Sequence, residues 1–213
     1  TMLVAPHYPA PPSPDMTPLT DPGRPAITAT ELYSDRWMFH GPAYQAVTRM
    51  DVMATNGIKG RLNALPAEGA LLDAAGQLFG YWVMAATDHD RLAMPIKIER
   101  MDLYGPEPRA GASVDCTVWL RRLGAHDVRA DLELVVGGRV WARITGWEDW
   151  RFETDDRIWP VMHKAEDNLY ATIEREGFAL LAEPKRSNAT RDYLTRRFLG
   201  EAERLTQIGR AHV

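Results

Sequence analysis

The sequence predicts an α+β protein in which an antiparallel sheet wraps round one long buried helix. Residues 69–86 contain no Lys, Arg or Glu and are apolar on nearly every side of a helix, as expected of a helix enclosed by other elements. Two β-type runs precede this helix and four follow it. Gly137 and Gly138 separate two alternating runs, which is typical of a hairpin between antiparallel strands.

The elements of this fold can be placed in order along the chain. Thr55, Asn56 and Gly57 form a turn signal between the first two β-type runs. The helix follows, and its glycines Gly76 and Gly80 each cost about 1 kcal/mol relative to alanine, so we expect close packing against them. The six strands are expected at residues 44–53, 58–65, 96–103, 113–122, 128–136 and 139–147.

Composition divides the chain into three parts. Residues 1–30 hold eight of the fifteen prolines and are expected to form an extended linker to something upstream, because proline fixes φ and lacks a backbone donor. Residues 31–153 carry the sheet and the buried helix. Residues 154–213 are expected to form a helical extension or the start of a following domain, with helices at 165–181 and after Asn188.

The composition also excludes several functions. A formal net charge of −4 without basic clusters argues against a nucleic-acid partner. The single cysteine, Cys116, excludes an internal disulfide and is expected to be a small core residue in a reducing compartment. No apolar run reaches the ~20 residues that span a bilayer, and the first residues lack a signal peptide. We therefore expect a cytoplasmic protein without a membrane partner.

Asp73 and Gln77 are the strongest indication of chemistry in the chain. They lie four residues apart, so they share one face of the predicted helix. A carboxylate on a buried helix is costly unless it is hydrogen-bonded, protonated or used in chemistry. The pair is therefore either a hydrogen-bonded structural feature or a catalytic acid with an amide partner.

Three stretches share their order and spacing with one protein family. Residues 33–45 contain a Gly-Pro-x-aromatic-Gln motif, residues 72–77 an Asp-x-x-x-Gln motif, and residues 138–149 a closing hairpin. Together they resemble the C-terminal half of a polyketide synthase dehydratase domain, and the resemblance covers roughly residues 33–152. It implies the hot-dog fold, in which an antiparallel sheet wraps round a central helix.

The resemblance implies a dehydratase of polyketide biosynthesis. A complete domain of that family is a double hot dog, in which a His from the N-terminal half removes the α-proton of a β-hydroxyacyl chain. Asp73 would protonate the departing hydroxyl and Gln77 would help to orient it. An apolar tunnel around the carboxyl would let it hold a proton near neutral pH. The substrate would be carried on the phosphopantetheine arm of an acyl carrier protein, with no external cofactor or metal.

The resemblance also implies substrate-binding positions. Pro95, which would open the strand after the helix, corresponds to a tunnel-lining position or simply starts the strand. Tyr44 suits the core as well as a substrate contact, and Gly41 with Pro42 equally suits a turn without ligand. The complete set of such positions is His40, Gly41, Pro42, Tyr44, Gln45 and Pro95.

The sequence departs from the family pattern at its histidines. The family's His-x-x-x-Gly-x-x-x-x-Pro motif is not found in the chain. His40 stands where the family more often has an aromatic residue, and we expect a loop or strand-edge histidine near the tunnel mouth, with a catalytic role as the alternative. The catalytic His is therefore expected from an N-terminal hot-dog half or from a second copy, in a homodimer or a multidomain megasynthase.

Two other functions stay open, together with a second resemblance. The chain could be a non-catalytic hot dog that serves as a scaffold or chain-binding template, or a hot-dog thioesterase with its carboxylate on the central helix. A histidine facing Asp73 would favour the dehydratase over the scaffold. Residues 193–204 resemble the opening helix of phosphopantetheinyl transferases, and an ordinary amphipathic helix is the alternative.

Overall fold

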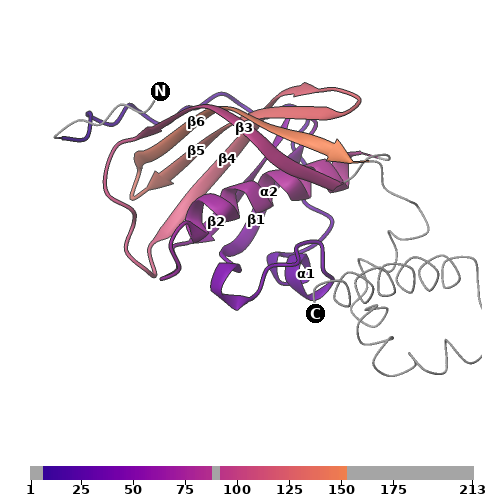
Figure 1. Ribbon diagram of the computed structural model, residues 1–213, viewed down its shortest axis with the longest axis horizontal. Helices are drawn as coiled ribbons and strands as arrows, with labels where there is room; N and C mark the ends of the chain where they lie inside the picture. The colour runs from indigo at the N-terminus through magenta and orange to yellow at the C-terminus, as the bar shows by residue number, and fades with distance from the viewer. Residues whose placement is uncertain (1–6, 88–91, 153–213) are drawn as a thin grey trace, which may run out of the picture. The chain divides into compact units, whose positions relative to one another are not determined.

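The computed structural model describes residues 7–87 and 92–152 of the chain (Figure 1). Contacts divide the chain into two compact units, Thr1–Thr154 and Asp155–Val213. The sheet and the long helix belong to the first unit. The helical extension expected over residues 154–213 lies outside the described residues.

A six-stranded antiparallel sheet wraps round one long helix (Figure 1). The strands are arranged in the order β1-β2-β4-β5-β6-β3. Two strands precede the long helix and four follow it, so the predicted fold class is confirmed. The elements are α1 (Ala29–Ser34), η1 (Pro42–Tyr44), β1 (Val47–Ala54), β2 (Gly57–Asn63), α2 (Ala70–Ala86), β3 (Leu92–Leu103), β4 (Ser113–Leu123), β5 (Asp127–Val136) and β6 (Arg139–Phe152).

Two strands, β1 and β3, begin more than one residue away from the predicted positions. Strand β1 begins at Val47 because Pro42 starts the 3-10 turn η1, whose first position suits the fixed φ of proline. Strand β3 begins at Leu92, so Pro95 lies within the strand and does not open it. Because β3 is an edge strand, proline is tolerated there, and the pairing register shifts next to it.

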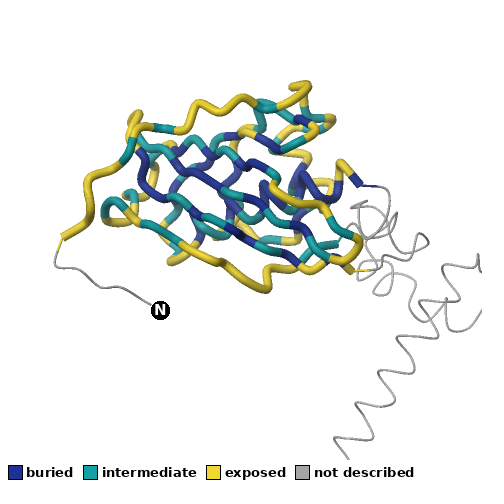
Figure 2. Tube along the Cα trace, turned by 90° about the horizontal axis from the view of Figure 1, so that it is seen from above, coloured by how far each residue is buried: buried dark blue, intermediate teal, exposed yellow. Residues whose placement is uncertain are grey.

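Helix α2 is buried over most of its length, as its apolar sequence predicts. Figure 2 shows buried positions gathered towards the middle of the described part of the chain and exposed positions along its outside. A Cβ atom added at Gly76 would lie 3.0 Å from Cζ2 of Trp147, and one at Gly80 would lie 3.2 Å from Cε of Met38. The expected close packing against both glycines is confirmed.

Part of the proline-rich segment packs on the outer face of the sheet. Trp119 and Glu133 alternate with core residues along β4 and β5, so their side chains point away from α2. Trp119 Nε1 donates to the carbonyl of Thr17 at 3.0 Å, and the Asp15 N–H donates to Glu133 Oε1 at 2.8 Å. These contacts, with the ion pair to Arg143, leave Glu133 only 3% exposed.

The two edges of the sheet differ. Gly23 and Met53 exchange two backbone hydrogen bonds of 2.8 and 3.0 Å, which cover the edge of β1. At the opposite edge, β3 pairs only with β6 among the described residues. Its apolar side chains Met94 and Ile96 are 52% and 56% exposed. The β3 edge is therefore the one left open within residues 7–87 and 92–152.

Candidate active site

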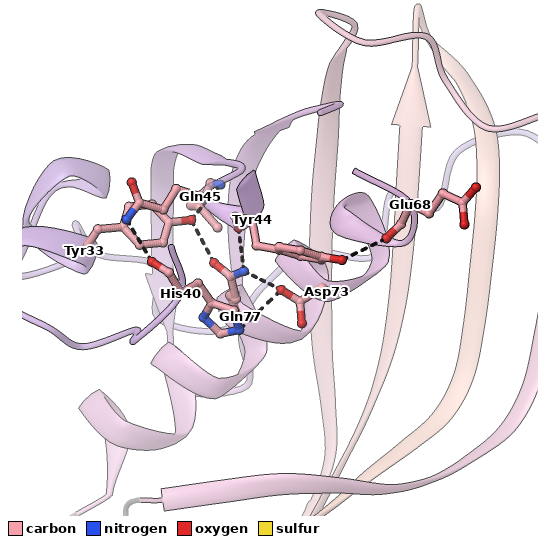
Figure 3. Close-up of polar contacts among 8 residues, drawn as sticks. Tyr33, His40, Tyr44, Gln45, Glu68, Asp73 and Gln77 are labelled. Atoms are coloured by element: carbon pink, nitrogen blue, oxygen red, sulfur yellow. Dashed lines mark hydrogen bonds and ion pairs between the residues drawn. The ribbon is translucent and has the colours of Figure 1, made fainter. Parts of the chain in front are cut away.

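Asp73 and Gln77 form a hydrogen-bonded pair near the start of α2 (Figure 3). Gln77 Nε2 donates to Asp73 Oδ2 at 2.6 Å and to the carbonyl of Tyr44 at 2.8 Å. The side chain of Gln77 is buried in the core between α2 and the segment before β1. The helical spacing that predicted a shared face therefore brings the carboxyl and the amide into direct contact.

Tyr33, at the end of α1, fixes the orientation of the Gln77 amide. Its hydroxyl donates to Gln77 Oε1 at 2.8 Å and accepts the Val47 N–H at 2.9 Å (Figure 3). Burial raises the pKa of Tyr33 to about 12, the Val47 hydrogen bond opposes this shift, and the Asp73 charge adds to it. The phenol thus remains a neutral donor, and the NH₂ group of Gln77 is turned towards Asp73.

The sequence did not single out Tyr33 as a site residue. Helix α1 is capped by Thr28, whose side chain forms a capping box with that of Glu31. This cap and the buried Leu32 place the last turn of α1 against β1 and α2. The signal available in the sequence was the aromatic residue at the start of the 33–45 stretch.

His40 also reaches the carboxyl of Asp73. His40 Nε2 lies 3.3 Å from Asp73 Oδ2, and its ring stacks on Phe39 with a centroid separation of 4.4 Å. Gln45 Nε2 donates to the backbone carbonyl of His40 at 2.8 Å (Figure 3). The other ring nitrogen, Nδ1, is buried and has no hydrogen-bond partner. His40 therefore lies in the loop before η1 and contacts the candidate acid.

The two oxygens of the Asp73 carboxyl differ in their surroundings. Oδ2 receives the contacts from Gln77 and His40. Oδ1 has no hydrogen-bond partner among the described residues and points away from the other labelled side chains (Figure 3). The carboxyl can therefore present Oδ1 to a substrate while Oδ2 is held in place.

Asp73 is less enclosed than the sequence led us to expect. Its side chain is 39% exposed, compared with 17% for His40. The expectation of a carboxyl closed off at the floor of an apolar channel is wrong for this chain by itself. Ala70, Leu71, Ala74 and Ala75 of the same turns are buried, so the exposure belongs to the side of α2 that carries Asp73 and not to its position along the helix.

Of the remaining candidate positions, Gly41, Pro42 and Tyr44 lie next to the hydrogen-bonded cluster, whereas Pro95 does not. Gly41 precedes η1 and Pro42 opens it, so both shape the turn that carries His40. Tyr44 contributes its carbonyl to Gln77, and its exposed hydroxyl donates to the carbonyl of Glu68 at 3.2 Å. Pro95 lies on β3 opposite Asp149 of β6, outside this hydrogen-bonded cluster.

The described residues hold no group of three or more His, Cys, Asp or Glu side chains placed to bind a metal ion. Nor does any helix among them have the length and apolar character to cross a membrane. The cluster of Tyr33, His40, Gln45, Asp73 and Gln77 is instead suited to proton transfer. It combines one carboxyl with the amide of Gln77, which donates to it, and the ring of His40, which contacts it.

Comparison with known families identifies the class of this domain. The model of the polyketide synthase dehydratase N-terminal domain matches residues 11–155, which is more than half of the chain. The chain therefore belongs to the polyketide synthase dehydratase family. Among curated proteins, none matches the sequence.

Solved dehydratase structures share the fold at low sequence identity. A trans-AT polyketide synthase dehydratase domain from Brevibacillus brevis has a TM-score of 0.52 and 16% identity, over 68% of this chain and 55% of that one. A variant of the GphF dehydratase has a TM-score of 0.52 and 18% identity, over 70% and 55%. The dehydratase domain of the CurF module of curacin polyketide synthase has a TM-score of 0.47 and 22% identity, over 60% and 48%.

These comparisons identify the fold and the family of the chain, but not which half of the dehydratase it is. The first two structures support the hot-dog fold, and the chain spans about half the length of all three. The matching family model is described as an N-terminal domain, so the assignment to a C-terminal half is not confirmed. The resemblance to phosphopantetheinyl transferases at residues 193–204 is not confirmed either and lies outside the described residues.

Proposed function

We propose that this chain is the acid-bearing, C-terminal half of a polyketide synthase dehydratase. It would act on a β-hydroxyacyl chain attached to the phosphopantetheine arm of an acyl carrier protein in the cytoplasm. The observation that carries the proposal is the Asp73 carboxyl, whose Oδ2 is held by Gln77 and His40 while Oδ1 is left open. Membership of the dehydratase family supports the same reaction.

In the proposed reaction, Asp73 acts as the general acid. A base removes the α-proton of the thioester, the electron pair forms the α,β double bond, and the bond between the β-carbon and the hydroxyl oxygen breaks. Asp73 Oδ1 gives its proton to that oxygen, so water leaves and a carboxylate remains. Gln77, which donates to Oδ2 at 2.6 Å, stabilises this carboxylate. No oxidant, reductant or metal ion is needed for the atoms and charges to balance.

A second hot dog, either upstream in the same polypeptide or in a second copy, would supply the base. It would also supply the residues that close the site to water. This chain spans about half of the dehydratase structures that it resembles, and its Asp73 side chain is 39% exposed. The open β3 edge, with Met94 and Ile96 exposed, suits docking of such a half. Exclusion of water by the partner would strengthen the hydrogen bonds that hold Asp73 and its substrate.

The test is the Asp73→Asn variant of the complete synthase module, supplied with its carrier-bound β-hydroxyacyl substrate. Asn cannot donate the acidic proton, so we expect the unsaturated product to fall by at least about 10²-fold and the β-hydroxyacyl intermediate to accumulate. Intact-mass measurement of the loaded carrier protein distinguishes the unsaturated product from the β-hydroxyacyl intermediate. The matched control is Asp115→Asn on the outer face of β4, where the carboxyl pairs with Arg61, and it should leave the yield unchanged.

Three other outcomes would contradict the proposal. Undiminished formation of the unsaturated chain by Asp73→Asn would remove Asp73 from the reaction. Release of a free β-hydroxy acid by the unmodified module, without loss of water, would identify a thioesterase. A module that neither dehydrates nor hydrolyses the chain would favour the scaffold function.

A further inference from the structure

We propose, on the basis of the dehydratase function above, that His40 is a positioning residue that donates a hydrogen bond to Asp73 and is not the base of the elimination. Within residues 7–87 and 92–152, His40 faces the candidate acid, at 3.3 Å from Nε2 to Oδ2. That distance alone is compatible with either role. The surroundings of its two ring nitrogens distinguish a positioning residue from a base.

The imidazole of His40 is held firmly beside the carboxyl. Its ring stacks on Phe39 with an interplanar angle of 18°, and its side chain is 17% exposed. Gln45 Nε2 holds the backbone carbonyl of His40 at 2.8 Å. The backbone contact fixes the position of the residue, and the stacking and burial restrict its ring, whose Nε2 is directed at Asp73 (Figure 3).

The buried Nδ1 atom determines where the ring proton lies. Neutral imidazole carries one N–H, on either nitrogen. A proton on Nδ1 would be buried without an acceptor, and the Nε2 lone pair would then face the carboxylate oxygen of Asp73. A doubly protonated ring would bury the same unpaired N–H. A proton on Nε2 alone avoids both problems, because it is donated to Asp73 and leaves only a lone pair at Nδ1.

This tautomer is unsuited to accepting a proton from the substrate. A histidine base that acts through Nε2 needs a lone pair on that atom and a proton on Nδ1, with an acceptor to orient it. In His40 the Nε2 atom faces Asp73, and Nδ1 has no acceptor among the described residues. The base must therefore come from elsewhere in the complete enzyme.

The same geometry assigns the transferable proton to one oxygen. Both donors, His40 Nε2 and Gln77 Nε2, meet at Asp73 Oδ2. An oxygen that accepts the Gln77 hydrogen bond and faces His40 Nε2 is poorly placed to hold a proton of its own, so we assign the acidic proton to Oδ1. His40 and Gln77 together keep that oxygen turned outwards to the substrate.

The first test reads the tautomer without reference to activity. The side-chain nitrogens of ¹⁵N-histidine-labelled protein are correlated with the ring protons by NMR near neutral pH, and His40→Gln identifies the signals. We expect the pattern of a neutral ring with its proton on Nε2. A proton on Nδ1, or a doubly protonated ring, would overturn the proposal.

The second test compares two substitutions in the complete module. His40→Gln keeps an N–H donor but cannot act as a base, so we expect kcat to stay within about tenfold of the unmodified module. His40→Phe removes the donor and releases Asp73, so we expect kcat to fall on the order of 10²-fold with little change in KM. Equal and large losses in both variants would identify His40 as the base.

The two proposals fail in different ways. If the unmodified module does not dehydrate its substrate, the proposed function fails, while the NMR experiment still decides the state of His40. If Asp73→Asn abolishes dehydration but His40→Gln does so equally, the dehydratase function stands and the positioning role of His40 is rejected.

Discussion

Asp149 illustrates how the fold alters the chemistry of a single side chain. It lies on β6, is 3% exposed, and accepts a hydrogen bond from Trp147 Nε1 at 2.7 Å. Burial raises its pKa from 3.8 to about 6, and the hydrogen bond from Trp147 opposes the shift. Because the folded state binds the proton more tightly, the contribution of this group to stability is present below about pH 4. It is lost as the pH rises through about 6.

Replacement of Asp149 by Asn should therefore stabilise the protein at neutral pH. Asn keeps an acceptor for Trp147 and removes the buried charge, so we expect the free energy of unfolding at pH 7 to rise by up to about 3 kcal/mol. The gain should shrink towards pH 4. Urea denaturation over this range measures it, with the half-exposed Asp115→Asn as control. A gain that does not change with pH would contradict the shifted pKa.

At the scale of elements, the packing of α2 depends on two glycines with different neighbours. Gly76 faces the ring of Trp147, which is 6% exposed and held by its hydrogen bond to Asp149. Gly80 faces the terminal methyl of Met38, the free end of a flexible side chain. The two positions therefore differ in whether the neighbour can move to admit a methyl group.

Alanine substitutions at these two positions should have opposite effects. Gly80→Ala should raise the free energy of unfolding by up to about 1 kcal/mol, because alanine favours the helix and Met38 can move aside. Gly76→Ala should lower it by about 1–3 kcal/mol, because the Trp147 ring cannot move. Thermal and urea unfolding measure both. A Gly76→Ala variant as stable as Gly80→Ala would show that the ring is not fixed.

At the scale of the whole described fold, the sheet has one covered edge and one open edge. Gly23 closes the β1 side through its pairing with Met53, whereas β3 exposes apolar side chains, Ile96 among them. An exposed apolar edge strand invites pairing with another strand. This asymmetry supports assembly of the complete dehydratase through β3.

A lysine on this edge should disrupt assembly and leave the fold intact. We expect Ile96→Lys to weaken association with the second half, or with a second copy, and to reduce dehydration by the complete module by about tenfold or more. Its thermal stability as an isolated chain should be unchanged. Sedimentation velocity and the carrier-protein mass assay measure these effects. Met16→Lys, at a position 86% exposed, is the control and should change neither.

Much of the architecture followed from patterns within short segments. The apolar surface of residues 70–86 and the two-residue period of the strands are local properties, and they predicted a buried helix within an antiparallel sheet. The Asp73 and Gln77 pair was predictable for the same reason, because helical spacing alone puts them on one face. Cys116 was expected in the core and is buried, and burial raises its thiol pKa to about 12.

The sequence by itself determined the fold class and the carboxyl and amide on the central helix, since both depend on neighbours within one or two turns. Only the tertiary structure decided that Tyr33, 44 residues before Gln77, sets the direction of its amide, and that His40 contacts Asp73. It also decided how open the carboxyl is and which sheet edge is covered. These features depend on where distant segments meet, and no periodicity in a single segment records such contacts.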